Sequence, residues 1–251
     1  MESPLSRRGT TFDPWRLVLL ANALLALAAL AGCGSPPPKP PMPSLDISRY
    51  GLLPFNDGAQ TNVKLPAEEL ASLEFVNSTG QPTKLGSLLG KKKLVLVVMR
   101  GYLPSQPAQK GPVVNGFCLY CCTQTSRLIA NYEEFRKRNA EVVVVVPVAK
   151  KPEAAQLDNF LVEVKKQPDA QGASSPFPLL VDLELRAVNQ LGIRDDLAKP
   201  ATYIFDERGQ VQFAYVGQHM ADRPSVKAIL AQLDQAKPPQ AKPPQEKPPQ
   251  P

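Results

Sequence analysis

The sequence has a single histidine, His219, and only four cysteines among its 251 residues. Three of the cysteines, Cys118, Cys121 and Cys122, lie within five positions, and the fourth is Cys33. A zinc site needs a second ligand pair at a suitable spacing, and none is present. A disulfide scaffold spaces its cysteines along the chain, which is not the pattern here. We therefore expect no metal, no other cofactor and no disulfide-stabilised scaffold.

The sequence also lacks a long apolar run and a basic patch interleaved with aromatic side chains. The net charge is +6 at pH 7, and lysines of the C-terminal repeats supply part of it. A nucleic-acid partner is therefore not expected. The longest apolar run, residues 17–31, is interrupted only by Asn22. It is too short for a transmembrane helix, which needs about 20 residues.

The N-terminus has the features of an export signal. Three arginines precede the apolar run, and the run ends with Leu-Ala-Gly-Cys at residues 30–33. This order resembles the lipobox of bacterial lipoproteins, in which the cysteine is lipidated and becomes the new N-terminus. The resemblance implies that residues 1–32 are a lipoprotein signal peptide. It also implies that Cys33 anchors the protein to a membrane of the cell envelope, on the periplasmic side in a Gram-negative cell. An ordinary signal peptide with a chance cysteine is the alternative.

Proline is abundant, with 28 residues, and it concentrates near the two ends of the chain. Residues 33–49 contain the stretch SPPPKPPMP, which predicts a stiff polyproline linker. Residues 236–251 repeat AKPPQ and have no apolar side chains for a core, so we expect a disordered tail. Contact between the spaced lysines of the tail and an acidic or cell-wall polymer is the alternative. One folded domain, residues 50–235, is expected between these ends.

The central region alternates strand and helix signals. Short apolar runs predict strands at residues 94–99, 141–148, 177–181, 201–205 and 211–216. Amphipathic stretches predict helices at residues 121–135, 152–166, 184–191 and 226–233. Asp222 is the expected N-cap of the last helix. The order predicts an α/β fold in which helices cover both faces of a mixed central β-sheet.

This order of elements, with Cys118-Leu119-Tyr120-Cys121 after the first buried strand, resembles the thioredoxin fold. Several stretches narrow the resemblance to the alkyl hydroperoxide reductase/thiol-specific antioxidant family, the redoxins. They are residues 73–90, 99–101, 177–182, 191–193, 200–206 and 217–225. The resemblance covers residues 65–235 approximately. It implies a thioredoxin-like fold and a thiol-dependent oxidoreductase.

Three features depart from the peroxiredoxins of this family. A stretch rich in proline, glycine and glutamine separates Gly101 from Cys118. In addition, Pro112 precedes Cys118 by six positions instead of seven, and Asn115 stands where a hydroxyl residue is expected. Lys199 replaces the arginine that orients the peroxide in that family. These departures favour disulfides over peroxides as substrates.

The two cysteines of the motif lie at the start of a predicted helix. Unpaired N–H groups and the helix dipole favour a thiolate there. Cys121 lies on the apolar face of the helix and is expected to be the more buried of the two. Cys118 precedes the first full turn and is expected to be the exposed nucleophile, with Cys121 as its resolving partner. The alternative is that both are small buried residues of a degenerate domain. Cys122 is expected to pack, although a role as a third redox partner stays open.

Four further residues are expected to support the site. The resemblance implies that Pro200 faces the cysteines and that the peptide bond preceding it is cis, whereas a trans proline that opens a strand is the alternative. Tyr120 is expected to influence specificity, and Arg100 and Lys199 to line the site. His219 is expected in a surface loop.

Together these features predict a lipid-anchored thiol-disulfide oxidoreductase outside the cytoplasm. Its partners would be a protein or small-molecule disulfide and an unidentified thiol reductant. A thiol peroxidase that reduces hydroperoxides is one alternative. A non-catalytic redoxin-fold binding module at the cell envelope is the other.

Overall fold

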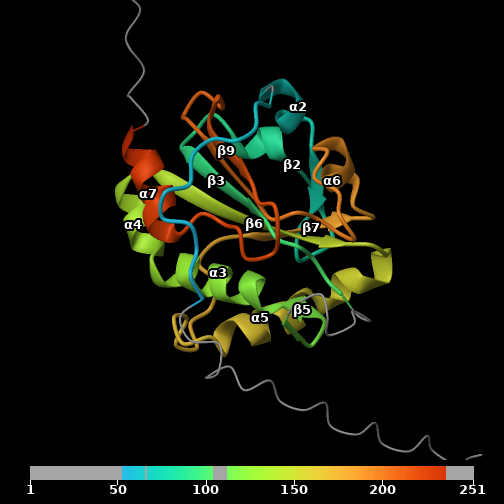
Figure 1. The fold of residues 1–251 in the computed structure, drawn as a ribbon. Coiled ribbons are helices and arrows are strands. Elements are labelled where there is room, and N and C mark those ends of the chain that lie inside the picture. Colours follow the sequence, from blue (N-terminus) through green and yellow to red (C-terminus); the bar gives the residue numbers. More distant parts are fainter. Residues whose placement is uncertain (1–52, 66, 104–111, 236–251) are drawn as a thin grey trace, which may run out of the picture. The chain divides into compact units, whose positions relative to one another are not determined.

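The computed structural model describes residues 53–65, 67–103 and 112–235 (Figure 1). The predicted signal peptide, Cys33, the proline-rich linker and the AKPPQ tail lie outside the described residues. Within these ranges, no helix combines the length and the apolar character needed to cross a membrane.

Seven strands form one mixed sheet in the order β2-β1-β7-β6-β3-β8-β9. The three central strands, β7, β6 and β3, run parallel, and an antiparallel hairpin flanks them on each side. The bounds of the seven strands are β1 (Glu74–Val76), β2 (Pro82–Lys84), β3 (Lys93–Val98), β6 (Ala140–Val148), β7 (Leu179–Leu183), β8 (Ala201–Phe205) and β9 (Val211–Val216). The valine-rich β3 and β6 are almost entirely buried, because side chains on both of their faces meet a helical layer.

Helices cover both faces of the sheet, as Figure 1 shows. The bounds of the helices are α2 (Ala67–Ala71), α3 (Leu119–Ala130), α4 (Tyr132–Lys137), α5 (Leu157–Lys165), α6 (Arg186–Gln190) and α7 (Val226–Gln235), with short 3-10 helices η2 (Leu85–Leu88) and η4 (Lys151–Gln156). One buried cluster joins Val95 and Val97 of β3 to α3, α4, α5 and α7. A second cluster joins the alternate β3 residues to α2 and α6. The predicted α/β thioredoxin-like fold is therefore confirmed.

Three of the predicted elements differ in their details. The helix predicted at 121–135 is divided into α3 and α4 at Asn131, whose side chain and backbone N–H both donate to the Arg127 carbonyl and so cap α3. Strand β7 begins at Leu179, because Pro178 has no N–H for a strand ladder. Helix α7 is capped by Ser225, whose Oγ accepts the Ala228 N–H at 3.1 Å.

Asp222 is therefore not the cap of α7, contrary to the sequence-based prediction. Its carboxylate instead accepts the Tyr215 hydroxyl at 2.5 Å and the Gln218 N–H at 2.8 Å. These bonds close the loop that leads from β9 to α7. His219 is exposed in this loop, as predicted.

Candidate functional site

A two-stranded hairpin that the sequence patterns did not predict leads into the cysteine motif. It consists of β4 (Val113–Val114) and β5 (Phe117–Cys118). Its turn is formed by Asn115, with φ 47°, and Gly116, with φ 82°, a left-handed pair typical of two-residue hairpins. A Cβ atom on Gly116 would lie 2.4 Å from the ring of Tyr102, so glycine is required here.

The hairpin is fastened to the rest of the domain on two sides. The Phe117 ring lies 5.1 Å, centroid to centroid, from both Tyr102 and Phe160. The Asn115 side chain donates to the Glu163 carboxylate of α5 at 2.6 Å. Asn115 is therefore directed to α5, and the hairpin it belongs to holds Cys118 against the domain.

All three cysteines of the motif region are buried free thiols in this structure. Cys118 and Cys121 are each 1% exposed, and Cys122 is fully buried. Cys118 pairs with Val113 in the hairpin and is the N-cap residue of α3. The prediction that Cys121 is buried is confirmed. The prediction that Cys118 is exposed is wrong, because the unpredicted hairpin holds this residue inside the domain.

Two hydrogen-bond donors converge on the sulfur of Cys121. The backbone N–H of Arg100, which follows β3, donates to Cys121 Sγ at 3.3 Å. The Nη2 group of Arg223, from the loop before α7, donates to the same sulfur at 3.2 Å. Donors to a sulfur favour its charged form, so the site is built to hold a thiolate at this position.

The guanidinium of Arg223 is buried, and its side chain is only 1% exposed. Nη1 donates to Gln124 Oε1 at 2.7 Å, and Nε donates to the Met220 carbonyl at 2.7 Å. In the described parts of the chain, no carboxylate forms an ion pair with it. A guanidinium stays protonated in proteins, and a buried charge without a counter-ion is costly. The anion available to Arg223 is the thiolate of Cys121.

The two cysteines of the motif differ in acidity. Burial alone would raise the pKa of Cys121, but the hydrogen bond from Cys118, the charge of Arg223 and the Arg100 N–H together lower it to about 5. The hydrogen bond to Cys121 and burial raise the pKa of Cys118 well above its usual range. Burial and the neighbouring negative charges of Cys121 and Glu163 raise the pKa of Cys122. The directions of these pKa shifts favour the negative charge on Cys121 over Cys118, the reverse of the order expected from the sequence.

The other residues predicted to support the site lie at various distances from the sulfurs. Tyr120 is half-buried, and its ring centroid lies 6.5 Å from that of Phe55. Arg100 contributes its backbone N–H, while its buried guanidinium pairs with Asp196 at 3.6 Å. Pro200 is buried and directly precedes Ala201, which pairs with Val98 at the end of β3. The peptide bond that precedes Pro200 is trans, so the predicted cis bond is wrong.

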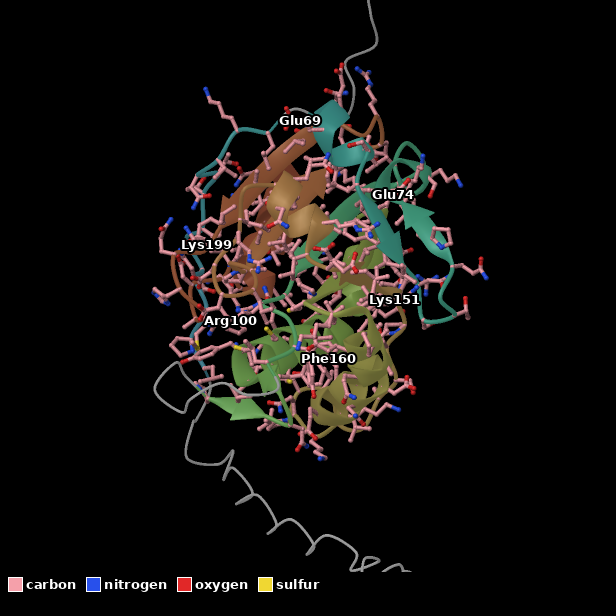
Figure 2. All side chains as sticks on the ribbon, turned by 90° about the vertical axis from the view of Figure 1, so that its right-hand side faces the viewer. Glu69, Glu74, Arg100, Lys151, Phe160 and Lys199 are labelled. Carbon is pink, nitrogen blue, oxygen red and sulfur yellow. The ribbon has the colours of Figure 1, made fainter. Side chains whose placement is uncertain are left out.

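Lys199 does not replace the missing arginine. Its backbone N–H donates to the Ile193 carbonyl at 2.9 Å, and the side chain is half-buried. Across the described residues, its ammonium group makes no hydrogen bond or ion pair with a cysteine. Figure 2 labels Lys199 and Arg100 on the same view of the molecule. The guanidinium at the sulfur belongs to Arg223, which the sequence patterns did not identify.

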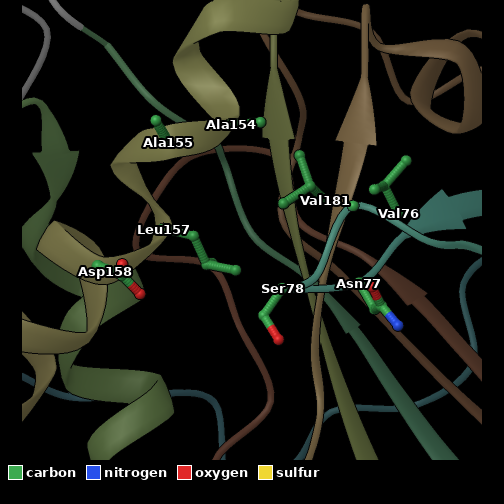
Figure 3. A pocket seen from close by; sticks show the side chains of 9 residues that line it. Val76, Asn77, Ser78, Ala154, Ala155, Leu157, Asp158 and Val181 are labelled. Carbon is green, nitrogen blue, oxygen red and sulfur yellow. The ribbon is translucent and has the colours of Figure 1, made fainter.

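A cavity of about 220 Å³, shown in Figure 3, has no cysteine among its lining residues. The turn between β1 and β2, the η4–α5 junction and Val181 of β7 line it. The described residues contain no group of three histidine, cysteine or acidic side chains arranged to hold a metal ion. The groups that offer chemistry at the cysteine site are therefore Cys118, Cys121 and Arg223.

The fold and the paired cysteines at the start of α3 define a thioredoxin-like redox protein. The sequence model of the AhpC/TSA family matches residues 63–214, and the chain belongs to this family. It is therefore a thiol-dependent oxidoreductase. No curated protein is significantly similar to the chain in sequence.

Several solved peroxiredoxins have a similar structure. A cysteine-to-serine mutant of peroxiredoxin 6 from Arenicola marina is 17% identical, with a TM-score of 0.53 over 69% of this chain and 73% of that chain. Peroxiredoxin Q from Xanthomonas campestris is 20% identical, with a TM-score of 0.48 over 72% of this chain and 99% of that chain. Peroxidoxin BcpB from Mycobacterium tuberculosis is 19% identical, with a TM-score of 0.45 over 72% of this chain and 100% of that chain. At these identities the likeness concerns the fold.

Proposed function

We propose that the chain is a thiol-disulfide oxidoreductase in which Cys118 and Cys121 cycle between a dithiol and a disulfide. The observation that carries this proposal is the buried Arg223 guanidinium, whose Nη2 group lies 3.2 Å from Cys121 Sγ. A charge in this position stabilises a thiolate, which is the form of cysteine that attacks. The thiol of Cys118 is hydrogen-bonded to the same sulfur, so the resolving partner is already in place.

In the proposed reaction Cys121 attacks and Cys118 resolves. The Cys121 thiolate forms a bond to one sulfur of the substrate disulfide, and the other substrate sulfur leaves as a thiolate. Cys118 then gives up its proton and attacks the Cys121 sulfur of the mixed disulfide, which releases the second substrate thiol. The substrate gains two electrons, and the cysteine pair becomes a disulfide. An external thiol reductant returns the pair to the dithiol form.

Peroxide reduction is the second candidate, and a specific feature of the site favours it. Lys199 stands where peroxiredoxins have an arginine, but Arg223 supplies a guanidinium to the Cys121 sulfur. The replacement by Lys199 is therefore no longer an argument against peroxidase activity. Both cysteines are only 1% exposed, which also suits a small oxidant. The Cys121 thiolate would attack one peroxide oxygen, the O–O bond would break, and the leaving oxygen would take up a proton. Cys118 would then attack the resulting sulfenic acid and release water.

The test is a pair of rates measured on the reduced protein, one with hydrogen peroxide and one with a disulfide substrate. With Cys118→Ser, the disulfide substrate should remain attached to Cys121, and Cys121→Ser should be inactive. A kcat/KM for peroxide of about 10⁷ M⁻¹s⁻¹ or more would favour the peroxidase. Full activity of Cys121→Ser would refute the proposed roles. If neither oxidant converts the pair to a disulfide, the proposed cycling of Cys118 and Cys121 is refuted.

We also propose that the protein works outside the cytoplasm, anchored to a membrane of the cell envelope through lipidated Cys33. The proposal is supported by the order of three arginines, an apolar run and Leu-Ala-Gly-Cys at residues 30–33. Membrane fractionation with metabolic lipid labelling should find the wild type labelled and membrane-bound, and Cys33→Ser unlabelled. A soluble, unlabelled wild-type protein would refute the anchor and leave the redox proposal intact.

A further inference from the structure

A segment that precedes the family match contacts both sides of the cysteine site. We call residues 53–62 the N-terminal strap. In Figure 1 it is the light blue trace that passes α3 and α7 and continues to β9. The match to the AhpC/TSA family begins at residue 63, so the strap lies before the matched region.

The strap is bonded to the backbone on both sides of Pro224, the residue that follows Arg223. The Asn56 N–H donates to the Arg223 carbonyl at 2.7 Å, and the Ser225 N–H donates to the Asn56 carbonyl at 3.0 Å. Asn56 therefore pairs with Pro224 as a short parallel bridge. The Asn56 side chain also donates to the Tyr215 hydroxyl at 3.3 Å. These bonds fix the stretch of backbone from which the Arg223 side chain reaches Cys121.

The same strap also contacts Tyr120, one of the two residues between Cys118 and Cys121. The Phe55 ring packs beside Tyr120, with ring centroids 6.5 Å apart. The guanidinium of Arg127, on α3, lies over the Phe55 ring at 4.8 Å and donates to the Leu53 carbonyl at 2.8 Å. The start of the strap is therefore held against the helix that carries the cysteines.

The rest of the strap is fastened to α7 and to the edge of the sheet. Gln232 of α7 donates to the Ala59 carbonyl at 3.4 Å. The Asn62 side-chain amide exchanges two hydrogen bonds of 2.9 Å with the backbone of Val216. Because β9 is an edge strand, these bonds occupy groups that would otherwise be unpaired. The strap is thus part of the folded domain from end to end.

We propose that the strap is a positioning element of the reactive centre, which holds the Arg223 guanidinium against Cys121 through its bonds to the Arg223 backbone. The inference rests on the proposed function, because it acts through the Cys121 thiolate. The guanidinium sits at the end of a long side chain, and its backbone anchor decides whether Nη2 stays within 3.2 Å of the sulfur. The attraction between two charges falls as their separation grows, and it falls further when water enters between them.

The other ionisable groups around Cys121 come from several elements. Cys118 ends β5 and caps α3, Cys122 lies on α3, and Arg100 follows β3 with its guanidinium paired to Asp196. Glu163 of α5 acts on Cys122. Of the charged groups that act on Cys121, Arg223 is the one whose backbone the strap holds.

The test removes the N–H that holds Arg223 and follows the reactivity of Cys121. Full-length Asn56→Pro lacks the donor to the Arg223 carbonyl. The matched control is Lys64→Pro, just beyond the strap, where the side chain is exposed and the described residues give its N–H no acceptor. Alkylation of Cys121 by iodoacetamide, mapped by mass spectrometry, is measured against pH. We expect the midpoint for Asn56→Pro to rise from about pH 5 by about one pH unit. Alkylation should then be roughly twofold slower at about pH 6 and roughly tenfold slower at about pH 4.

The wild-type profile is expected for Lys64→Pro. A folded Asn56→Pro protein that keeps the wild-type profile overturns the positioning role. If Asn56→Pro does not fold, Phe55→Ala is measured in its place: a rise in its midpoint supports the proposal, and an unchanged midpoint overturns it. A wild-type protein without a low-pH thiolate would instead contradict the proposed function, before any strap variant is examined.

Discussion

The most unusual single residue in the domain is Arg223, a guanidinium that is 1% exposed. An arginine in this setting cannot relieve the cost of burial by losing its proton, because a guanidinium stays protonated in proteins. Hydrogen bonds to Gln124 and to the Met220 carbonyl satisfy some of its N–H groups without neutralising its charge. The charge is left to act on Cys121, so this cysteine and not Cys118 becomes the acidic one.

Replacing Arg223 should raise the pKa of Cys121 from about 5. We expect an upward shift of one to two units, roughly, for Arg223→Met, because both a nearby charge and a hydrogen bond are lost. A smaller rise is expected for Arg223→Lys, which keeps the charge but loses the planar fork. The ultraviolet absorbance of the thiolate, followed against pH in the reduced protein, measures both. Arg208→Met, at an exposed turn, is the control, and an Arg223→Met titration identical to that of wild type would contradict the account.

The sequence indicates that Cys118 and Cys121 form the reactive pair, but it does not indicate which of the two has the lower pKa. The spacing of Cys118 and Cys121 at a helix start follows from local pattern, and so does the burial of Cys121. The exposure of Cys118 depends on the β4–β5 hairpin, and the charge at Cys121 comes from a residue more than a hundred positions away. Such contacts are set by tertiary packing, which no local pattern contains. Arg223 lies in a stretch that resembles the family, but nothing in that stretch indicates where its side chain points.

Among the elements, the β4–β5 hairpin has the greatest effect on the site. It brings Cys118 into the buried region and is held by the Phe117 ring and by the Asn115–Glu163 hydrogen bond. Its turn depends on Gly116, which has a positive φ and lies against the Tyr102 ring.

Gly116→Ala should therefore loosen the hairpin. We expect a loss of about 1 to 3 kcal/mol in the free energy of unfolding, because alanine is strained at this φ and its Cβ meets the Tyr102 ring. Cys118 should also become more reactive toward a thiol reagent. Gly80→Ala is the control, since its φ of 80° is similar but open space surrounds it. Urea denaturation compares the two, and equal losses would show that the contact with Tyr102 contributes nothing.

The remaining elements follow closely from the sequence pattern. The valine-rich stretches become the central strands, and the strands at 201–205 and 211–216 have the predicted bounds. Apolar runs of β-branched residues and a turn signal are local properties, which is why they suffice. The differences arise where one side chain competes for backbone groups, as Asn131 does at the end of α3 and Ser225 at the start of α7.

For the whole molecule, the acidity of Cys121 makes stability depend on pH. The folded-state pKa of about 5 lies below the unfolded value of about 8.5. A depressed pKa contributes stability that is fully present above the unfolded pKa and is lost as the pH falls through the folded pKa. In the reduced protein, unfolding takes up close to one proton at this cysteine over the window from about pH 5 to about pH 8.5.

The unfolding free energy of the reduced wild type should therefore rise with pH relative to Cys121→Ser. The slope of the difference should be about 1.4 kcal/mol per pH unit at most in this window. Above the window, the raised pKa of Cys118 acts with the opposite sign. Urea denaturation in the presence of a reductant, at several pH values, gives the difference. A flat difference would mean that Cys121 is protonated in the folded protein.

The most direct test of the central claim is to identify which cysteine reacts first in the reduced wild-type protein. Brief alkylation at about pH 6, one unit above the pKa of Cys121, is followed by digestion and mass mapping of all three buried cysteines. The account predicts the label on Cys121, with Cys118 and Cys122 unmodified. Label on Cys118 with Cys121 unmodified would contradict the account. So would the absence of any label at this pH, which lies below the usual range of thiol pKa values.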